Sequence, residues 1–249
     1  MQLWTMEHAK TLLPAVAVMI LIALGLRFWL GKKPLKVRMI PLQIATCVLL
    51  LLEVGKQVLS LKQGYDLYHL PFHYCSLFLF VMPLMCFYRG KYRQQVNAVA
   101  ISICAAMFLL LMIYPCLIYS DQNIREFFTS YFSFHTVAYH NLVVFLFILI
   151  LALDLYTPGR KQDQVTVILF VAVFCVVAAT MAHILETNYA NFYSCNIAPL
   201  EAVRQAVADA IGTLVAKLVY IAILTALNIL FTLGAYNLCR LSYKATKLK

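Results

Sequence analysis

Seven stretches of this chain are long enough and apolar enough to cross a lipid bilayer. A spanning helix needs about 20 mostly apolar residues. Of the 249 residues 63% are hydrophobic and only 12% are charged, well outside the range of soluble domains. We therefore predict an all-α fold, a polytopic membrane bundle whose residues 1–249 form a single domain. Its seven transmembrane helices are expected at about residues 11–30, 37–60, 70–88, 96–118, 131–153, 165–185 and 210–237.

The basic residues gather in alternate connections between these spans. Lysine and arginine mark the first, third and fifth connections and the C-terminal tail, whereas the other connections carry few of them. By the positive-inside rule, this alternation predicts an outer N-terminus and a cytoplasmic C-terminus in a multi-pass protein of the cell membrane. It also accounts for the net charge of +10 without a nucleic-acid partner. The basic residues of these three connections and the tail are Arg27, Lys32, Lys33, Lys36, Arg38, Arg89, Lys91, Arg93, Arg160, Lys161, Arg240, Lys244, Lys247 and Lys249.

Polar residues inside the spans fall mostly in their outer halves once this orientation is adopted. Such side chains are costly in a bilayer and are more often functional than incidental. Six helices direct polar groups outward, which predicts a polar chamber that opens toward the outer face. Its candidate substrate-binding residues are Glu53, Lys56, Lys217, Asn188 and Tyr189, and its candidate catalytic residues are Cys75, His140 and His73.

Several of these residues also have plain structural interpretations. Glu53 and Lys56 share a helix face and could form an ion pair that only joins helices. Lys217 could extend its long side chain to the outer interface, and Tyr189 could be an ordinary interfacial residue. Repeats of three and four residues align Asp209 with Lys217 on one face of the expected last helix, about 12 Å apart along its axis.

Two histidines of the fifth span cannot both face the same place in the chamber. His135 and His140 are five residues apart, which is about 140° around a helix. We therefore assign His140 to the chamber and His135 to packing or the interface.

Cys75 stands in the segment Leu70-Pro71-Phe72-His73-Tyr74-Cys75-Ser76-Leu77, directly before an apolar run. Proline favours the first turn of a helix, so Cys75 is expected near a helix N-terminus, where the helix dipole favours a thiolate. Apolar surroundings act in the opposite direction and favour the inert thiol. If residues 73–75 are extended, His73 and Cys75 share a side; if they are helical, they do not.

The order and spacing of these motifs resemble the YwaF-like family of bacterial integral membrane proteins, which includes the animal acyltransferase transmembrane protein 164. The likeness covers about residues 50–225. It includes the Leu70–Leu77 segment, Glu53-Val54-Gly55-Lys56, Tyr114-Pro115, Thr187-Asn188-Tyr189 and Gly212-Thr213-Leu214-Val215. Two residues depart from the family pattern: Glu186 stands where bacterial members often have glycine, and Ser76 stands where the animal enzyme has histidine.

This resemblance implies acyl transfer to a lysophospholipid through a reactive cysteine, with a phospholipid or lysophospholipid substrate and no cofactor. Cys75 would carry the acyl group, and His140 would be its general base or orienting residue. The residues by themselves permit this chemistry, since a thiol beside a histidine suits attack on an ester. Lys56, Lys217 or Asn188 could stabilise the oxyanion.

Two other functions remain open. The chain could be a non-enzymatic transporter or binder of a small polar or lipid ligand, although the nearly apolar inner half argues against a transport pathway. A metal site formed by His73, Cys75 and His140 has suitable ligand types, but its spacing matches no established motif. Cys195, in an outer loop, could be paired or free, and the oligomeric state is left open.

Overall fold

The computed structural model describes residues 3–159 and 161–247, and every regular element within these ranges is a helix. This confirms the all-α fold; Arg160 and Lys249 lie outside the described residues. The α-helices are α1 Met6–Leu30, α2 Leu35–Arg38, α3 Ile40–Lys62, α4 Phe78–Phe87, α5 Arg93–Ile113, α6 Asp121–Arg125, α7 Tyr131–Ala152, α8 Lys161–Ile184, α9 Ala198–Ile211 and α10 Thr213–Lys247. Short 3₁₀ helices lie at η1 Leu67–His69, η2 Tyr74–Leu77, η3 Pro115–Leu117 and η4 Tyr189–Asn191.

Six helices of the described chain are long and apolar enough to cross a membrane. The expected third span is shorter, because its helical part covers only Tyr74–Phe87, about 20 Å against a hydrocarbon core of about 30 Å. Leu70 has an extended backbone, as expected for the residue before a proline, and His73 is extended too.

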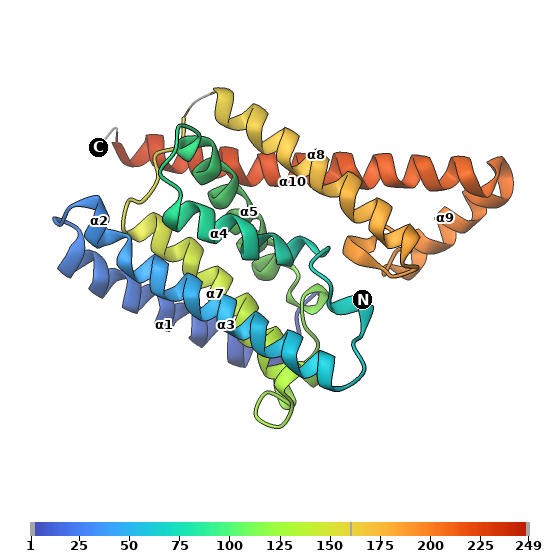
Figure 1. The fold of residues 1–249 in the computed structure, drawn as a ribbon, viewed down its shortest axis with the longest axis horizontal. Helices are drawn as coiled ribbons and strands as arrows, with labels where there is room; N and C mark the ends of the chain where they lie inside the picture. The colour runs from blue at the N-terminus through green and yellow to red at the C-terminus, as the bar shows by residue number, and fades with distance from the viewer. Residues whose placement is uncertain (1–2, 160, 248–249) are drawn as a thin grey trace.

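The path of the chain is compatible with an odd number of crossings. In Figure 1, α4 runs back toward the end of the bundle where α1 meets α2, and the two termini lie at different ends. Seven crossings and the orientation of the termini nevertheless remain predictions.

Helix α5 forms the centre of the bundle. It contacts α4, α7, α8 and α10, and its residues 97–107 are buried without interruption. A helix that is apolar on all sides belongs in such an enclosed position. Helix α7 packs against α5 on one side and against α1 and α3 on the other (Figure 1). Helices α3 and α7 bring the polar side chains of Glu53 and His135 together toward one end of the bundle.

The expected seventh span is divided by Gly212. This residue has φ of +89°, a conformation that favours glycine, and it ends α9 before α10 begins. Asp209 lies on α9 and Lys217 on α10, so the expected shared face on one helix is wrong. The positive φ breaks the register that the spacing of three and four residues assumed.

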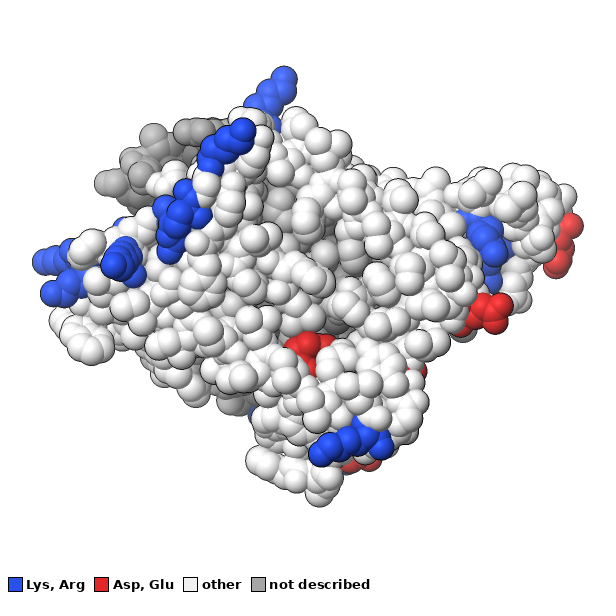
Figure 2. All heavy atoms as spheres, viewed as in Figure 1, with Lys and Arg blue, Asp and Glu red and all other residues white. Residues whose placement is uncertain are grey.

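The charges are distributed unevenly over the surface. In Figure 2, most of the Lys and Arg side chains in view lie at the end with the α1–α2 connection and the α4–α5 turn. The Asp and Glu side chains in view lie away from it. We call the first the basic end and the opposite one the far end. This distribution favours a cytoplasmic location for the basic end.

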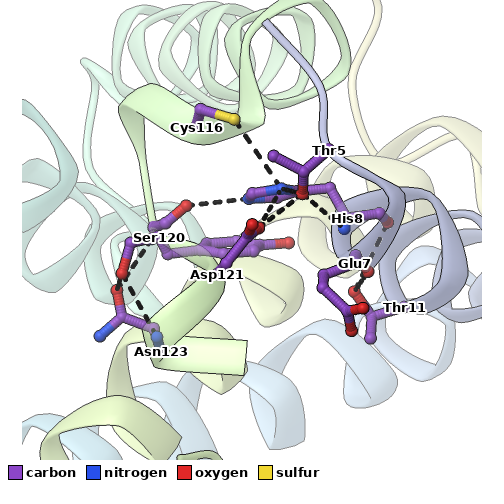
Figure 3. A network of polar contacts seen from close by, with 9 residues as sticks. Thr5, Glu7, His8, Thr11, Cys116, Ser120, Asp121 and Asn123 are labelled. Carbon is purple, nitrogen blue, oxygen red and sulfur yellow. Dashed lines mark hydrogen bonds and ion pairs between the residues drawn. The ribbon is translucent and has the colours of Figure 1, made fainter. Parts of the chain in front are cut away.

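A buried histidine fastens α1 to the bundle at the far end. The His8 side chain is fully buried, and its Nε2 donates to the carbonyl oxygen of Tyr119, 2.9 Å away. Its Nδ1 lies 2.7 Å from Thr5 Oγ1 and 3.3 Å from Asp121 Oδ1. Figure 3 shows these groups converging, with the Cys116 thiol beside the imidazole. Helix α1 is otherwise largely exposed, so this network is its polar attachment at the far end, while Arg27 bonds to Ala152 and Asp154 near the other end of the helix.

We expect His8→Ala to lower the free energy of unfolding by about 1–3 kcal/mol, because buried polar partners lose their hydrogen bonds. Thermal unfolding in detergent micelles would measure the loss. Lys10→Ala, an exposed position on the same helix, is the control and should change little. Equal stability of the two variants would contradict the attachment.

Candidate functional site

A buried carboxylate joins α3 to α7 at the far end. Glu53 on α3 is only 8% exposed. Its Oε1 accepts hydrogen bonds from Lys56 Nζ and Gln57 Nε2, each at 2.7 Å. Its Oε2 lies 3.2 Å from Nε2 of His135 on α7. The spacing of three and four residues along α3 places the first two partners on the same face as the carboxylate.

The network continues into the loop between α3 and α4. Gln57 Nε2 also donates to the carbonyl oxygen of His69 at 2.8 Å, and Tyr65 donates to Gln57 Oε1 at 2.8 Å. The His69 imidazole bonds to Ser60 Oγ at 2.7 Å. Burial, and then the nearby charge of Lys56, lower the pKa of His69, which favours its neutral form. The loop is therefore fixed to the polar face of α3.

Cys75 lies in the 3₁₀ turn η2, immediately before α4. This agrees with the expected position near a helix N-terminus. The hydroxyl of Tyr139 on α7 donates to the Cys75 carbonyl oxygen at 3.0 Å. The Tyr139 ring in turn stacks on His135, with centroids 5.2 Å apart. Among the charged groups, Lys56 and Glu53 are close enough for their fields to reach the Cys75 thiol. The thiol-bearing turn is thus tied to α7 by a hydrogen bond.

His140 follows Tyr139 directly, and its imidazole has a defined hydrogen-bonding role. Its Nδ1 lies 2.7 Å from the Thr136 carbonyl oxygen, which can only accept a hydrogen bond. Nδ1 must therefore carry the proton, leaving the lone pair on Nε2. The rings of Tyr139 and Tyr119 flank the imidazole, with centroids 5.6 and 6.5 Å away.

His73 has an extended backbone, but Tyr74 and Cys75 already lie in the 3₁₀ turn η2, so the fully extended arrangement that would place His73 and Cys75 on one side is not formed. The His73 Nε2 donates to the Tyr68 carbonyl oxygen at 3.0 Å. Its ring contacts the Tyr68 and Tyr189 rings, with centroids 4.4 and 5.4 Å apart. Tyr189 is fully buried, and its hydroxyl donates to the carbonyl oxygen of Leu67. These two candidate site residues therefore fix the loop that precedes Cys75.

Two other expected members of the chamber lie elsewhere. Asn188 organises its own loop by accepting the backbone N–H groups of Tyr193 and Ser194 and donating to Asn196. Lys217 lies on α10, where its charge acts on His183 of α8. No contact joins either residue to Glu53 or Cys75 among the described residues. The structure thus brings together only part of the set that the sequence suggested.

His135 and Tyr139 are the site residues that sequence reasoning missed. The spacing along α7 placed them together on one face, but it could not indicate that this face meets Glu53. The described residues contain no group of three or more His, Cys, Asp or Glu side chains suited to hold a metal ion. Cys195 is a free thiol, and its backbone N–H donates to Glu201 Oε2 at 2.9 Å.

An open apolar groove adjoins the polar cluster. It has a volume of about 460 Å³ and is lined by Gly55, Val58, Leu59, Lys62 and Tyr131. Gly55 lets α7 approach closely, since a Cβ there would meet the Tyr131 hydroxyl at 2.0 Å. That hydroxyl donates to the Leu52 carbonyl oxygen at 3.0 Å. The cluster is filled by its own hydrogen bonds, and the adjoining groove is suited to apolar groups.

A second buried carboxylate lies at the basic end, where the sequence analysis expected little polarity. Asp163, at the start of α8, is fully buried. Its Oδ2 accepts from Tyr156 at 2.7 Å, Gln94 at 3.1 Å and Tyr236 at 3.2 Å. Burial, and then its bonds with Tyr236 and Asp163, raise the pKa of Tyr156 far above its usual value, so Tyr156 remains a donor. Polar groups from separate helices therefore meet at both ends of the bundle.

A model of the TMEM164 family matches residues 3–236 of this chain. The match covers nearly the whole sequence and confirms the resemblance that the motifs indicated. Comparisons with curated proteins and with solved structures gave no significant match.

Removing the Glu53 charge should destabilise the fold, because Lys56 would remain as an unpaired, largely buried cation. We expect Glu53→Gln to cost about 3 kcal/mol of unfolding free energy, measured by thermal unfolding in micelles. The double variant Glu53→Gln/Lys56→Met removes both charges and should recover much of the loss. A double variant as unstable as the single one would contradict an ion pair at this position.

Proposed function

This chain belongs to the TMEM164 family, and we propose that it is a membrane-embedded acyltransferase acting through a thioester on Cys75. It would transfer a fatty acyl group from a phospholipid to a lysophospholipid. The observation that carries the proposal is the hydrogen bond from Tyr139 to the Cys75 carbonyl oxygen. It joins the turn that bears the thiol to the helix that bears His140.

In the first half of the reaction, Nε2 of His140 takes the proton from the Cys75 thiol. The thiolate attacks the ester carbonyl carbon of the donor lipid and forms a tetrahedral intermediate. When this collapses, the C–O ester bond breaks and the imidazolium returns the proton to the leaving alkoxide. The products are a lysophospholipid and an acyl-Cys75 thioester.

In the second half, the hydroxyl of an acceptor lysophospholipid attacks the thioester while His140 takes its proton. Collapse breaks the C–S bond, and the proton passes to the Cys75 sulfur, which restores the thiol and the neutral imidazole. The positive charge of Lys56, whose field reaches Cys75, would stabilise the oxyanion in both halves. Glu53 would hold the Lys56 ammonium in place.

His73 and Tyr189 serve in this proposal as positioning residues. Their hydrogen bonds to the carbonyl oxygens of Tyr68 and Leu67 fix the segment before Cys75. The apolar groove beside Gly55 and Tyr131 supports a lipid substrate, because an acyl chain could lie along it near the polar cluster. Asn188 and Lys217 take no part in the proposed reaction.

Cys75→Ala should abolish acyl transfer in reconstituted vesicles that contain a labelled donor phospholipid and a lysophospholipid acceptor. The purified wild-type protein should show an acyl adduct on Cys75 by mass spectrometry. Cys47→Ala, which removes an exposed thiol on α3, is the control. Full turnover by Cys75→Ala, with the protein folded and inserted, would exclude the thioester.

The base can be assigned separately. His140→Gln should lower kcat about 10²-fold or more, the usual contribution of a general base. His135→Gln should have a smaller effect, because its Nε2 is directed at Glu53. Measuring kcat for the two variants tests whether His140→Gln causes the larger loss. A larger loss in His135→Gln would assign the general base to His135.

A second candidate function is binding or transport of a small polar or lipid ligand. The buried Asp163 cluster at the basic end favours it, because it adds polar groups in the half of the bundle that the sequence suggested was apolar. Such an activity would survive Cys75→Ala and be reduced by Asp163→Asn. Uptake by the same vesicles therefore distinguishes the two functions.

A further inference from the structure

A polar cleft of about 470 Å³ opens at the basic end, and helix α4 separates its α5 wall from the Cys75 turn along the chain. Three separate parts of the chain form the cleft: α2, the first turns of α5 and the segment that follows α7. The described residues that line it are Leu35, Arg38, Arg93, Gln94, Asn97, Asp154, Leu155, Tyr156 and Thr157. None of them takes part in the proposed acyl transfer.

Hydrogen-bonding groups in this cleft lack protein partners. Asn97 is only 7% exposed, and its side-chain Oδ1 is buried without a hydrogen bond to any described residue. The Nε groups of Arg38 and Arg93 are buried and unpartnered in the same way. A buried polar group without a partner is costly, at about 1–3 kcal/mol each. The Asn97 oxygen can only accept a hydrogen bond, so among these groups the two guanidinium groups alone, which donate, favour an anionic ligand in the cleft.

The charges facing the cleft favour an anion. Arg38 and Arg93 contribute two guanidinium groups, and the only carboxylate among the described lining residues is Asp154. That carboxylate already pairs with Arg27 at 2.9 Å. Asp163 lies close by, but its Oδ2 is held by Gln94 and by two tyrosine hydroxyls. The described lining is therefore positive overall, and its carboxylates are engaged elsewhere.

The donors are arranged for an oxyanion with several acceptor oxygens. Nη1 of Arg38 donates hydrogen bonds to the carbonyl oxygens of Leu153 and Asp154. These bonds hold the plane of its guanidinium group at the cleft. Arg93 stands at the first position of α5, which has no side-chain cap, so the partial positive charge of a long helix adds to its own. Guanidinium groups bind phosphate through paired hydrogen bonds.

We propose that this cleft binds a phosphate group. Its position at the basic end would suit the headgroup of an anionic phospholipid, since basic pockets between helices take such headgroups. Leu35 and Leu155 in the wall would contact the adjoining glycerol and acyl region. Inorganic phosphate presents the same chemistry, so the test separates the two sources.

The test titrates the full-length protein in a neutral detergent with phosphatidylglycerol, counting bound lipid by native mass spectrometry. A parallel calorimetric titration uses inorganic phosphate. Arg93→Gln should weaken binding about tenfold or more, because it removes a charged hydrogen-bonding partner. Arg89→Gln removes the same charge from the neighbouring turn, outside the cleft, and should bind as the wild type does.

Each outcome decides the proposal. If the wild type binds the lipid and Arg93→Gln weakens that binding, the result supports a phospholipid headgroup as the ligand. If the wild type binds only inorganic phosphate and Arg93→Gln weakens that binding, the result supports the free ion. No binding of either probe by the wild type would overturn the proposal. So would equal losses in Arg89→Gln and Arg93→Gln, which would indicate only a general charge effect. Cys75→Ala should bind normally, so failure of the acyltransferase proposal would be seen separately.

Discussion

The far end of the bundle is organised by the need of the buried Glu53 carboxylate for hydrogen-bonding partners. A bilayer cannot hydrate a charge, so a carboxylate on a spanning helix must find its partners within the protein. Glu53 finds two on its own helix and a third, His135, on α7. His135 positions Tyr139 by stacking, and Tyr139 holds the backbone of Cys75. One buried charge therefore connects three separate segments of chain.

The same constraint accounts for the irregular segment before α4. Non-helical backbone at membrane depth is tolerated only where other parts of the protein satisfy it. Here side chains from three other places do so: Gln57 bonds to His69, Tyr189 to Leu67, and Tyr139 to Cys75. Tyr189, which the sequence suggested as a substrate-binding residue, therefore helps Gln57 and Tyr139 to support the turn that presents the thiol.

Several features of the site could be predicted from sequence because they depend on local spacing. The shared face of Glu53 and Lys56 follows from helical geometry, and the position of Cys75 at the start of a helix follows from Pro71. The partner of Glu53 on α7 could not be predicted. Periodicity separates the faces of His135 and His140, but it does not tell which face meets α3. Likewise, Asp163 looks like a loop charge in the sequence, because its tyrosine partners come from distant segments.

The sequence by itself determined that the chain is an all-helical membrane protein, since the length and apolarity of its spans leave few other structures. It also determined the alternation of basic connections and, through its motifs, the family. Only the tertiary structure decided which polar groups meet. It separated Lys217 from Asp209 at Gly212, paired Glu53 with His135, and opened the cleft between Arg38 and Arg93. The reason is physical: hydrophobicity acts along each segment, whereas the pairing of buried polar groups depends on how the helices pack against one another.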